Sequence, residues 1–240
     1  VMILLGVVTA SAIFFIYLYK IGVEKKSFLD LSIVIIATVG VGVIFGILFE
    51  NLYEAIKDSV SGLIPHWTWG MTFYGGLFGG VVTYLLMYRY YYLRNNPPIF
   101  KKMLVIAPGC ICIGHAFGRI GCFLSGCCYG ITTGTSLDVN FLGIGPHLPT
   151  QIIEMMFLLI LGGILLVFSF KNYTNYTAVI YLFAYSIFRF VIEFCRGDER
   201  GQLAGLSPSQ YWCIILFLGA GLLLYFYKKR VFANDETKAV

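Results

Sequence analysis

Seven long apolar stretches follow one another along the chain, separated by short polar segments. Each is about 18 residues or longer, enough for a helix to cross the roughly 30 Å hydrocarbon core of a bilayer. The stretches cover residues 2–19, 29–49, 71–93, 103–125, 150–170, 177–195 and 208–227. The pattern therefore predicts an all-α integral membrane protein, with seven transmembrane helices in a single polytopic domain over residues 1–240.

Composition supports the same class. Hydrophobic residues make up 59% of the chain and charged residues only 12%, and the mean hydropathy is +0.83. Soluble domains carry about 25% charged residues. A transmembrane β-barrel would show segments of about ten residues with alternating hydrophobicity, which the chain lacks. The first apolar stretch has no basic leader and no small-residue cleavage site, so we expect it to be a retained helix.

The lysines and arginines predict the orientation in the membrane. If the amino terminus lies outside, most of them fall in the inner loops and the carboxyl-terminal tail: Lys20, Lys25, Lys26, Arg89, Arg94, Lys101, Lys102, Lys171, Lys228, Lys229, Arg230 and Lys238. The outer loops hold only Lys57, Arg196 and Arg200. Because basic loops are retained on the cytoplasmic side, we expect an outer amino terminus and a cytoplasmic carboxyl terminus.

Two of the polar segments are predicted to lie outside. Residues 50–70 contain Trp67 and Trp69, and tryptophan favours the headgroup level of a bilayer, so we interpret this segment as an interfacial helix followed by a tryptophan belt. Residues 126–149 form the second outer loop.

Paired glycines open the third apolar stretch. Gly75 and Gly76 come directly after Tyr74. Glycines on one helix face permit close packing against another helix, or the close approach of a ligand. The spacing alone does not decide between these two alternatives.

A polar stripe marks the end of the fourth stretch. His115, Arg119 and Cys122 are spaced i, i+4 and i+7, so they share one helix face. An adjacent face carries Gly114, Gly118 and Gly121. Placing an arginine at the centre of a membrane helix costs about 2.5 to 3.5 kcal/mol, so such a residue usually faces a protein interior or a wet cavity. The alternative is an arginine that extends to the interface.

The sixth stretch carries a second stripe. Tyr185, Arg189, Glu193 and Arg196 fall within about 80° of one another around a helix. The alternative to a functional site is an Arg189 and Glu193 pair that neutralises itself at spacing i, i+4. In the fifth stretch, Gln151 and Glu154 lie near the outer end; Glu154 either stabilises the helix dipole or faces a cavity.

Three cysteines cluster in the sequence at the outer end of the fourth stretch: Cys122, Cys127 and Cys128. A disulfide from Cys122 to Cys127 or Cys128 is chemically permitted outside the cell. A nucleophilic or redox-sensitive thiol is a further alternative. The spacing of these cysteines and His147 matches no standard metal-binding pattern, so we predict no metal and no cofactor.

The candidate residues all fall on the predicted outer halves of their helices. Two arginines at the same depth, without an equal number of evident buried partners, indicate an anionic ligand that is itself amphipathic. The planar guanidinium group suits phosphate. We therefore expect a phospholipid headgroup that enters from the outer leaflet. No basic patch interleaved with aromatic residues is present, so we expect no nucleic acid partner.

Several motifs occur in a familiar order. They are Gly70-Met-Thr-Phe-Tyr-Gly-Gly-Leu-Phe-Gly, Gly118-Arg-Ile-Gly-Cys-Phe-Leu-Ser-Gly, Pro149-Thr-Gln-Ile-Ile-Glu, Tyr185-Ser-Ile-Phe-Arg-Phe-Val-Ile-Glu-Phe-Cys-Arg and Leu206-Ser-Pro-Ser-Gln. With these motifs the chain resembles the prolipoprotein diacylglyceryl transferase family over residues 69–212. That family moves the diacylglyceryl group of phosphatidylglycerol to the thiol of a lipobox cysteine, on the outer face of the bacterial cytoplasmic membrane.

The resemblance implies that Arg119 and Arg189 hold the phosphate and stabilise the leaving group. Together with the two stripes, it predicts these catalytic residues: Arg119, Arg189, Tyr185, Glu193 and Tyr74. The predicted substrate-binding residues are Arg119, Arg189, Arg196, His115, Gln151, Glu154, Gln210, Gly75 and Gly76. The implied partners are a phosphatidylglycerol-like membrane lipid and a prolipoprotein signal peptide.

The chain departs from the family pattern at four positions. Tyr74 and Leu148 stand where the family has histidines, and Cys122 and Cys127 stand where it has asparagine and glutamate. The general base is therefore open among Tyr74, His115 and Glu193. The alternatives to the standard activity are a divergent enzyme with another acceptor or headgroup chemistry, and a non-catalytic lipid-binding membrane protein.

Overall fold

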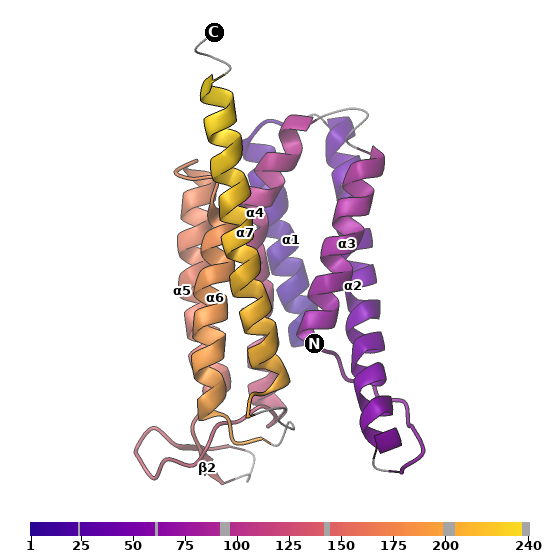
Figure 1. Ribbon diagram of the computed structural model, residues 1–240, viewed down its shortest axis with the longest axis vertical. Coiled ribbons are helices and arrows are strands. Elements are labelled where there is room, and N and C mark those ends of the chain that lie inside the picture. The colour runs from indigo at the N-terminus through magenta and orange to yellow at the C-terminus, as the bar shows by residue number, and fades with distance from the viewer. Residues whose placement is uncertain (24, 61, 92–96, 142–144, 199–204, 237–240) are drawn as a thin grey trace. The chain divides into compact units, whose positions relative to one another are not determined.

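The computed structural model describes residues 1–240 except 24, 61, 92–96, 142–144, 199–204 and 237–240 (Figure 1). Most of these residues are helical, and the described part of the chain forms seven α-helices. They are α1 (Met2–Lys20), α2 (Lys25–Val60), α3 (Phe73–Tyr91), α4 (Pro97–Leu124), α5 (Thr150–Phe170), α6 (Thr177–Ile192) and α7 (Pro208–Glu236). A 3-10 helix, η1 (Glu193–Cys195), directly follows α6.

The all-α membrane class is confirmed, and six of the helices are long and apolar enough to cross a membrane. These six spans are Met2–Lys20, Phe28–Val60, Lys102–Leu124, Thr150–Phe170, Thr177–Cys195 and Pro208–Lys229. In α3 the apolar stretch found among the described residues is shorter, Tyr74–Met87. The seventh crossing and the orientation of the termini stay predictions. Arg94, Arg200 and Lys238, which count in the charge distribution, lie outside the described residues.

The chain divides into two compact units. One consists of Val1–Tyr17 and Lys101–Val240, and the other of Leu18–Phe100. The larger unit holds most of the candidate residues. That all of residues 1–240 form one polytopic domain stays a prediction.

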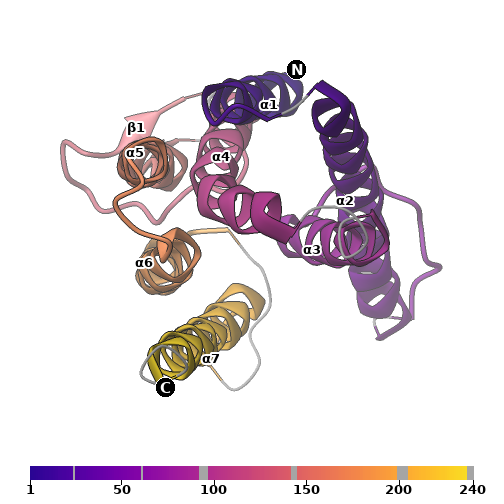
Figure 2. The same ribbon diagram turned by 90° about the horizontal axis from the view of Figure 1, so that it is seen from above.

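In the larger unit, α5 lies beside α6, and α6 beside α7, in both ribbon views (Figures 1 and 2). Two side-chain hydrogen bonds join α4 to α5 and α6. The hydroxyl groups of Ser169 and Thr177 both donate to the carbonyl oxygen of Val105, over 2.9 and 2.7 Å. All of these groups are removed from water, so each hydrogen bond offsets a desolvation cost.

Small residues bring α1 against α4. A Cβ atom added at Gly6 would lie 2.8 Å from the carbonyl oxygen of Gly114, and one at Gly121 would lie 3.3 Å from Met2 Cβ. The glycine face of α4 therefore packs against α1 at Gly114 and Gly121. A Cβ at Gly118 would meet no atom of the described chain within 4 Å.

In the smaller unit, α2 continues without a break to Val60. The helix expected at the start of residues 50–70 is thus the end of α2 and not a separate interfacial helix. The extended chain after it is fixed by Asn51, which accepts from the amide of Thr68 and donates to its carbonyl, over 2.8 and 2.9 Å. His66 Nδ1 lies 2.8 Å from Asp58 Oδ2. Whether this segment lies at a membrane surface stays a prediction.

Glycines also join α3 to α2, which gives a first test of the packing. We expect Gly79→Ala to lower the free energy of unfolding by about 1–3 kcal/mol, because the added methyl group would overlap the Phe45 side chain. Gly40→Ala in α2 is the matched control. Its methyl group would meet nothing within 4 Å, so stability should stay the same or rise by up to about 1 kcal/mol. Thermal unfolding in detergent micelles measures both; equal Tm values would contradict the close packing at Gly79.

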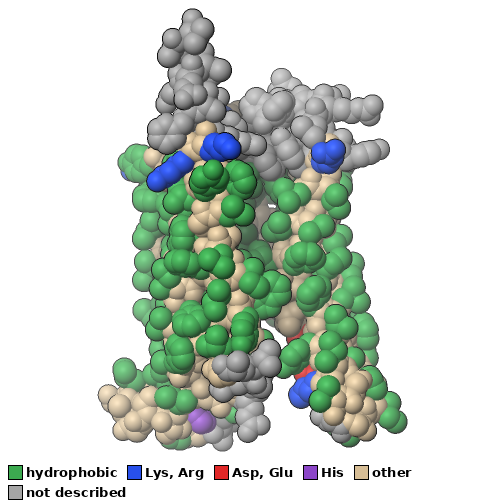
Figure 3. All heavy atoms as spheres, in the orientation of Figure 1, with side chains coloured by type: hydrophobic (Ala, Val, Ile, Leu, Met, Phe, Trp, Pro, Cys, Tyr) green, Lys and Arg blue, Asp and Glu red, His purple; other side chains and the backbone are tan. Residues whose placement is uncertain are grey.

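The outer surface of the helices is apolar. Large hydrophobic side chains are exposed on every described helix that spans, for example Leu4 on α1, Ile36 on α2, Ile160 on α5 and Leu218 on α7. In Figure 3 hydrophobic side chains cover much of the visible length of the helices in each unit. Exposed apolar side chains along whole helices are typical of surfaces that contact lipid.

The predicted outer loop 126–149 contains a small hairpin that the sequence did not indicate. Strand β1 (Val139–Asn140) pairs antiparallel with β2 (Pro146–His147), and Val139 lies opposite His147. The ring of His147 stacks on Tyr129 with centroids 4.6 Å apart. The hairpin follows the cysteine cluster and leads directly into α5.

Candidate active site

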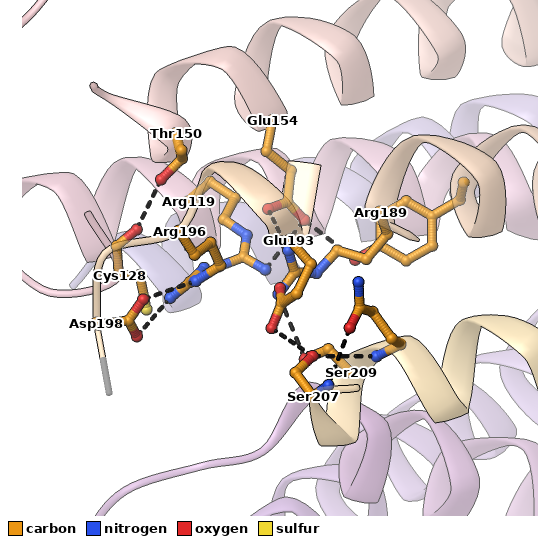
Figure 4. Close-up of polar contacts among 12 residues, drawn as sticks. Arg119, Cys128, Thr150, Glu154, Arg189, Glu193, Arg196, Asp198, Ser207 and Ser209 are labelled. Atoms are coloured by element: carbon orange, nitrogen blue, oxygen red, sulfur yellow. Dashed lines mark hydrogen bonds and ion pairs between the residues drawn. The ribbon is translucent and has the colours of Figure 1, made fainter. Parts of the chain in front are cut away.

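Glu154, on the second turn of α5, is the centre of a buried polar cluster in the larger unit (Figure 4). Its side chain is 2% exposed. Atom Oε1 lies 3.0 Å from Nη2 of Arg119 and accepts a hydrogen bond from the hydroxyl of Tyr185 over 3.1 Å. The same oxygen is 3.8 Å from Nε2 of His115, and Oε2 is 3.9 Å from Nη1 of Arg189. Glu154 is thus a buried partner of arginine and tyrosine side chains, and its exposure to a cavity stays a prediction.

A second buried carboxylate, Glu193, lies beside the first. Nη2 of Arg189 lies 2.6 Å from Glu193 Oε2 and 3.4 Å from the hydroxyl of Ser209. The hydroxyl of Ser207 donates to Glu193 Oε1 over 2.8 Å. The i, i+4 pair that the sequence suggested is therefore formed, and it is tied to α7 by two serines.

The sequence argument that the two arginines lack buried partners is wrong. Arg119 is paired with Glu154, and Arg189 with Glu193 and, at longer range, Glu154. Two guanidinium and two carboxylate charges balance within this group. The balance lowers the cost of burying any one of the four charges, which would be several kcal/mol for an unpaired ion. Arg119 does not extend to an interface, because its side chain is 11% exposed.

Two guanidinium nitrogens in the cluster nevertheless make no hydrogen bond within the described chain. They are Nε of Arg119 and Nη1 of Arg189, and both atoms are buried. Most buried polar atoms in folded proteins do have a hydrogen-bond partner. Nη1 of Arg189 has only the 3.9 Å ion-pair contact with Glu154 Oε2, so both donors could accommodate a further acceptor.

Helix capping places Ser207 and Gln210 at the start of α7. The amide of Gln210 donates to the hydroxyl oxygen of Ser207 over 3.3 Å, and the amide of Ser207 donates to Gln210 Oε1 over 2.9 Å. This is the reciprocal capping box of the pattern Ser-x-x-Gln. The side-chain oxygen of Gln210 thus accepts the capping hydrogen bond. The predicted binding of substrate by Gln210 would therefore use its side-chain amide nitrogen.

Arg196 is positioned differently from the other arginines. It forms a two-point ion pair with Asp198, with Nε to Oδ1 at 2.8 Å and Nη2 to Oδ2 at 2.7 Å. Although burial opposes its charge, the hydrogen bonds with Asp198 and Cys128 raise the pKa of Arg196. It lies just outside α6 and η1 and pairs with Gly130 in an isolated β-bridge. A Cβ atom on Gly197 would lie 2.5 Å from the carbonyl oxygen of Gly130, and one on Gly130 would lie 2.7 Å from that of Cys195.

The three cysteines at the end of α4 and on the following turn come together in space. The Sγ atoms of Cys122, Cys127 and Cys128 lie within 4.8 Å of one another, and none is in a disulfide. Hydrogen bonds from Cys122 and Cys127, with a smaller effect of the nearby Arg196 charge, lower the pKa of Cys128 well below its ordinary value. Hydrogen bonds with Cys122 and Cys128 raise the pKa of Cys127. The disulfide considered from the sequence is not formed.

Comparison with known proteins places this arrangement in a family. A family model described as prolipoprotein diacylglyceryl transferase matches residues 1–227. The chain belongs to the prolipoprotein diacylglyceryl transferase family. Among its relatives, phosphatidylglycerol–prolipoprotein diacylglyceryl transferase 2 of Clostridium perfringens (strain 13 / Type A) is 33% identical over 233 residues, covering 93% of this chain and 88% of that protein. The Clostridium tetani (strain Massachusetts / E88) phosphatidylglycerol–prolipoprotein diacylglyceryl transferase is 34% identical over 183 residues, covering 71% and 72%.

Membership in this family makes the chain a bacterial membrane enzyme, in agreement with its six apolar helices. The resemblance over residues 69–212 noted from the motifs is confirmed, and the family match extends to the first two helices as well.

In the larger unit of the transferase chain, the predicted substrate-binding residue Gln151 donates to the carbonyl oxygen of Cys127. The predicted site residues Tyr74, Gly75 and Gly76 lie in the smaller unit. A Cβ atom at Gly75 would lie 2.6 Å from Phe49 Cβ, and one at Gly76 would lie 3.3 Å from the carbonyl oxygen of Gly42. Both glycines thus serve the packing of α3 on α2, the first of the two alternatives. The ligand-binding role of Gly75 and Gly76 and the catalytic role of Tyr74 stay predictions.

Sequence reasoning about this transferase missed four residues that hold the site together. They are Thr150, Asp198, Ser207 and Ser209. The signal for Ser207 was present in Ser-Pro-Ser-Gln, which is a capping box. The other three are short polar residues at helix ends, and nothing in their spacing indicates which neighbouring helix they contact.

Proposed function

We propose that this protein transfers the diacylglyceryl group of phosphatidylglycerol to the thiol of a lipobox cysteine in a prolipoprotein. The relatives that share most of its length carry names for this reaction. The proposal includes the predicted orientation: the cluster around Glu154 faces the outer leaflet, where a prolipoprotein signal peptide and the lipid would meet. Twelve basic residues in the inner segments against three outside support that orientation.

One observation carries the assignment of the phosphate site. Nε of Arg119 and Nη1 of Arg189 are buried without a hydrogen-bond partner in the described chain. A phosphodiester offers anionic oxygens that would accept from both, and charge-assisted bonds of this kind are about twice as strong as neutral ones. The paired carboxylates Glu154 and Glu193 then hold the two cations in place before the lipid arrives.

The chemistry of transfer fits such a site. The acceptor sulfur forms a bond to the glycerol carbon of the diacylglyceryl group, and the bond from that carbon to the phosphate oxygen breaks. The electron pair of the broken bond stays on the phosphate, which leaves as glycerol phosphate with one more negative charge. A prepositioned donor aimed at such a developing charge is worth roughly 3 kcal/mol.

Incubation of the purified protein with phosphatidylglycerol vesicles and a lipobox peptide tests the proposed reaction. We expect mass spectrometry to find the peptide heavier by one diacylglyceryl group, together with glycerol phosphate in equal amount. A peptide with serine in place of the lipobox cysteine is the control and should stay unmodified. A different headgroup product, or bound phospholipid without any product, would refute the transferase assignment and favour altered chemistry or a lipid-binding protein, respectively.

A further inference from the structure

The cysteine cluster adjoins the proposed phosphate site, and nothing in the steps above uses it. Cys122 lies in the last turn of α4, and Cys127 and Cys128 lie on the turn that follows. Two side chains of α5 fix this turn: Gln151 donates to the carbonyl oxygen of Cys127 over 2.6 Å, and Thr150 to that of Cys128 over 2.9 Å. The three sulfur atoms are therefore held together by the fold, without a covalent bond.

The sulfur positions suit a metal ion. Zinc binds cysteine sulfur at about 2.3 Å, so two sulfurs at tetrahedral corners are about 3.8 Å apart. The three Sγ atoms lie within 4.8 Å of one another, which needs only small side-chain adjustments to reach that geometry. Thiolate ligands select thiophilic ions such as Zn²⁺ over Mg²⁺ or Ca²⁺. Three protein ligands with one open position are typical of catalytic zinc, whereas structural zinc has four.

The charges around the sulfurs favour a divalent ion. Three thiolates and a divalent cation leave one negative charge, and Arg196 donates a hydrogen bond to the sulfur of Cys128. The positive charge of Arg119 also acts on Cys122 and Cys128. A monovalent ion would leave a larger negative charge to compensate.

The cluster is accessible from outside. Cys127 is exposed, and Cys122 and Cys128 are half-buried. A ligand can therefore reach the fourth position of a bound ion. Cys122 follows Arg119 by three residues, slightly less than one helical turn, which is about 4.5 Å along the axis. A sulfur on the ion and a phosphate on Arg119 would thus lie close enough to share one substrate.

We propose that Cys122, Cys127 and Cys128 bind one thiophilic divalent ion of the Zn²⁺ class, and that the acceptor thiol becomes its fourth ligand. The role of the acceptor rests on the transferase function proposed above, whereas the ion site itself rests on the three sulfurs.

Coordination would prepare the acceptor for transfer. The thiol releases its proton to water when it binds, because a thiol coordinated to such an ion is deprotonated. The thiolate then forms the carbon–sulfur bond while the carbon–oxygen bond to phosphate breaks, as described above. The ion stays divalent throughout, so no oxidant or reductant is needed. The product is a neutral thioether, a weaker ligand than a thiolate, and dissociates.

The first test is metal binding by the full chain in detergent micelles, after treatment with a chelator and a reductant. Titration with Cd²⁺, followed by sulfur-to-metal charge-transfer absorbance, should saturate at one ion per chain, and direct metal analysis after Zn²⁺ loading should agree. Cys122→Ser, Cys127→Ser and Cys128→Ser should each weaken binding by tenfold or more, on the order of the loss seen when groups that support a metal site are removed. Cys195→Ser, a half-buried cysteine outside the cluster, is the matched control and should bind normally.

The second test concerns the acceptor. Addition of the lipobox peptide to the Cd²⁺-loaded protein should raise the charge-transfer absorbance by about one third, since four thiolates replace three. The peptide with serine should cause no change. In the transfer assay at pH 7, removal of the ion should slow the reaction about tenfold or more, and Zn²⁺ should restore it. A free thiol with a pKa near 8.5 is only about 3% ionised at that pH, so coordination raises the thiolate fraction. Coordination also lowers the nucleophilicity of each thiolate, which offsets part of this gain.

The possible failures are distinguishable. Binding that persists in all three serine variants, or a disulfide among these cysteines that forms in place of metal binding, would overturn the ion site. Transfer at an equal rate with and without the ion, or an unchanged absorbance on peptide addition, would overturn the acceptor role. If no lipidated peptide forms under any condition, the transferase function fails, while the stoichiometry of the ion still decides the site.

Discussion

Arg119→Lys is expected to lower kcat/KM for diacylglyceryl transfer by about 100-fold or more while the fold keeps its stability. A lysine ammonium can replace the contact between Arg119 Nη2 and Glu154, which is 3.0 Å. It cannot also supply the donor at Nε, which has no hydrogen-bond partner in the described chain. The loss of one such donor to a developing negative charge costs about 100- to 1,000-fold in rate.

The substitution separates the phosphate role of Arg119 from its structural role. Because the charge beside Glu154 is retained, the Tm in detergent should change little. The effect should fall mainly on kcat, since the interaction strengthens as charge develops on the leaving phosphate. Arg89→Lys, on an exposed arginine of α3, is the matched control and should act within about twofold of the wild type. Wild-type kcat/KM in Arg119→Lys would refute the phosphate role.

Much of the fold could be predicted because the bilayer fixes the length of each apolar helix. Six of the seven predicted stretches correspond to helices that can span. The periodicity of α4 and α6 also placed the key side chains on the correct faces: His115, Arg119, Tyr185 and Arg189 all lie within reach of Glu154. Helical spacing is sufficient for this, because it fixes direction around a single axis.

The contacts between helices could not be predicted in the same way. Spacing within α5 shows where Glu154 points, but not that α4 and α6 bring two arginines to it. The apparent shortage of buried partners for Arg119 and Arg189 followed from this gap, since their carboxylates come partly from other helices. Likewise, the apolar stretch 29–49 does not show where α2 ends, because the helix continues through polar residues to Val60.

The cysteines illustrate the same limit. Their spacing matches no standard metal pattern because two of them lie on a turn whose path is set by Thr150 and Gln151. Only the folded chain brings the three sulfur atoms within 4.8 Å of one another. The prediction of no metal rested on sequence spacing, which does not show this proximity, and metal binding by the full chain is the measurement that tests it.

Glu154→Gln is expected to lower the free energy of unfolding by about 3 kcal/mol, because it leaves the Arg119 charge buried without its partner. Glu154 has 2% of its side chain exposed and lies near both buried arginines. Unfolding in a graded mixture of denaturing and mild detergent measures the change. Glu54→Gln is the matched control: Glu54 pairs with Lys57, which is 61% exposed, and exposed pairs contribute about 1 kcal/mol or less.

A double-mutant cycle shows whether this loss comes from the unpaired charge. Arg119→Gln alone should also destabilise, since it removes one of two cations beside Glu154. The double variant, with Arg119→Gln and Glu154→Gln, removes a cation and an anion together and leaves the Arg189 and Glu193 pair intact. We therefore expect it to lose ~2 kcal/mol less stability than the sum of the two single variants, within the range for groups in direct contact. Additive losses would mean that Glu154 stabilises the fold through packing or through Arg189, and not through its ion pair with Arg119.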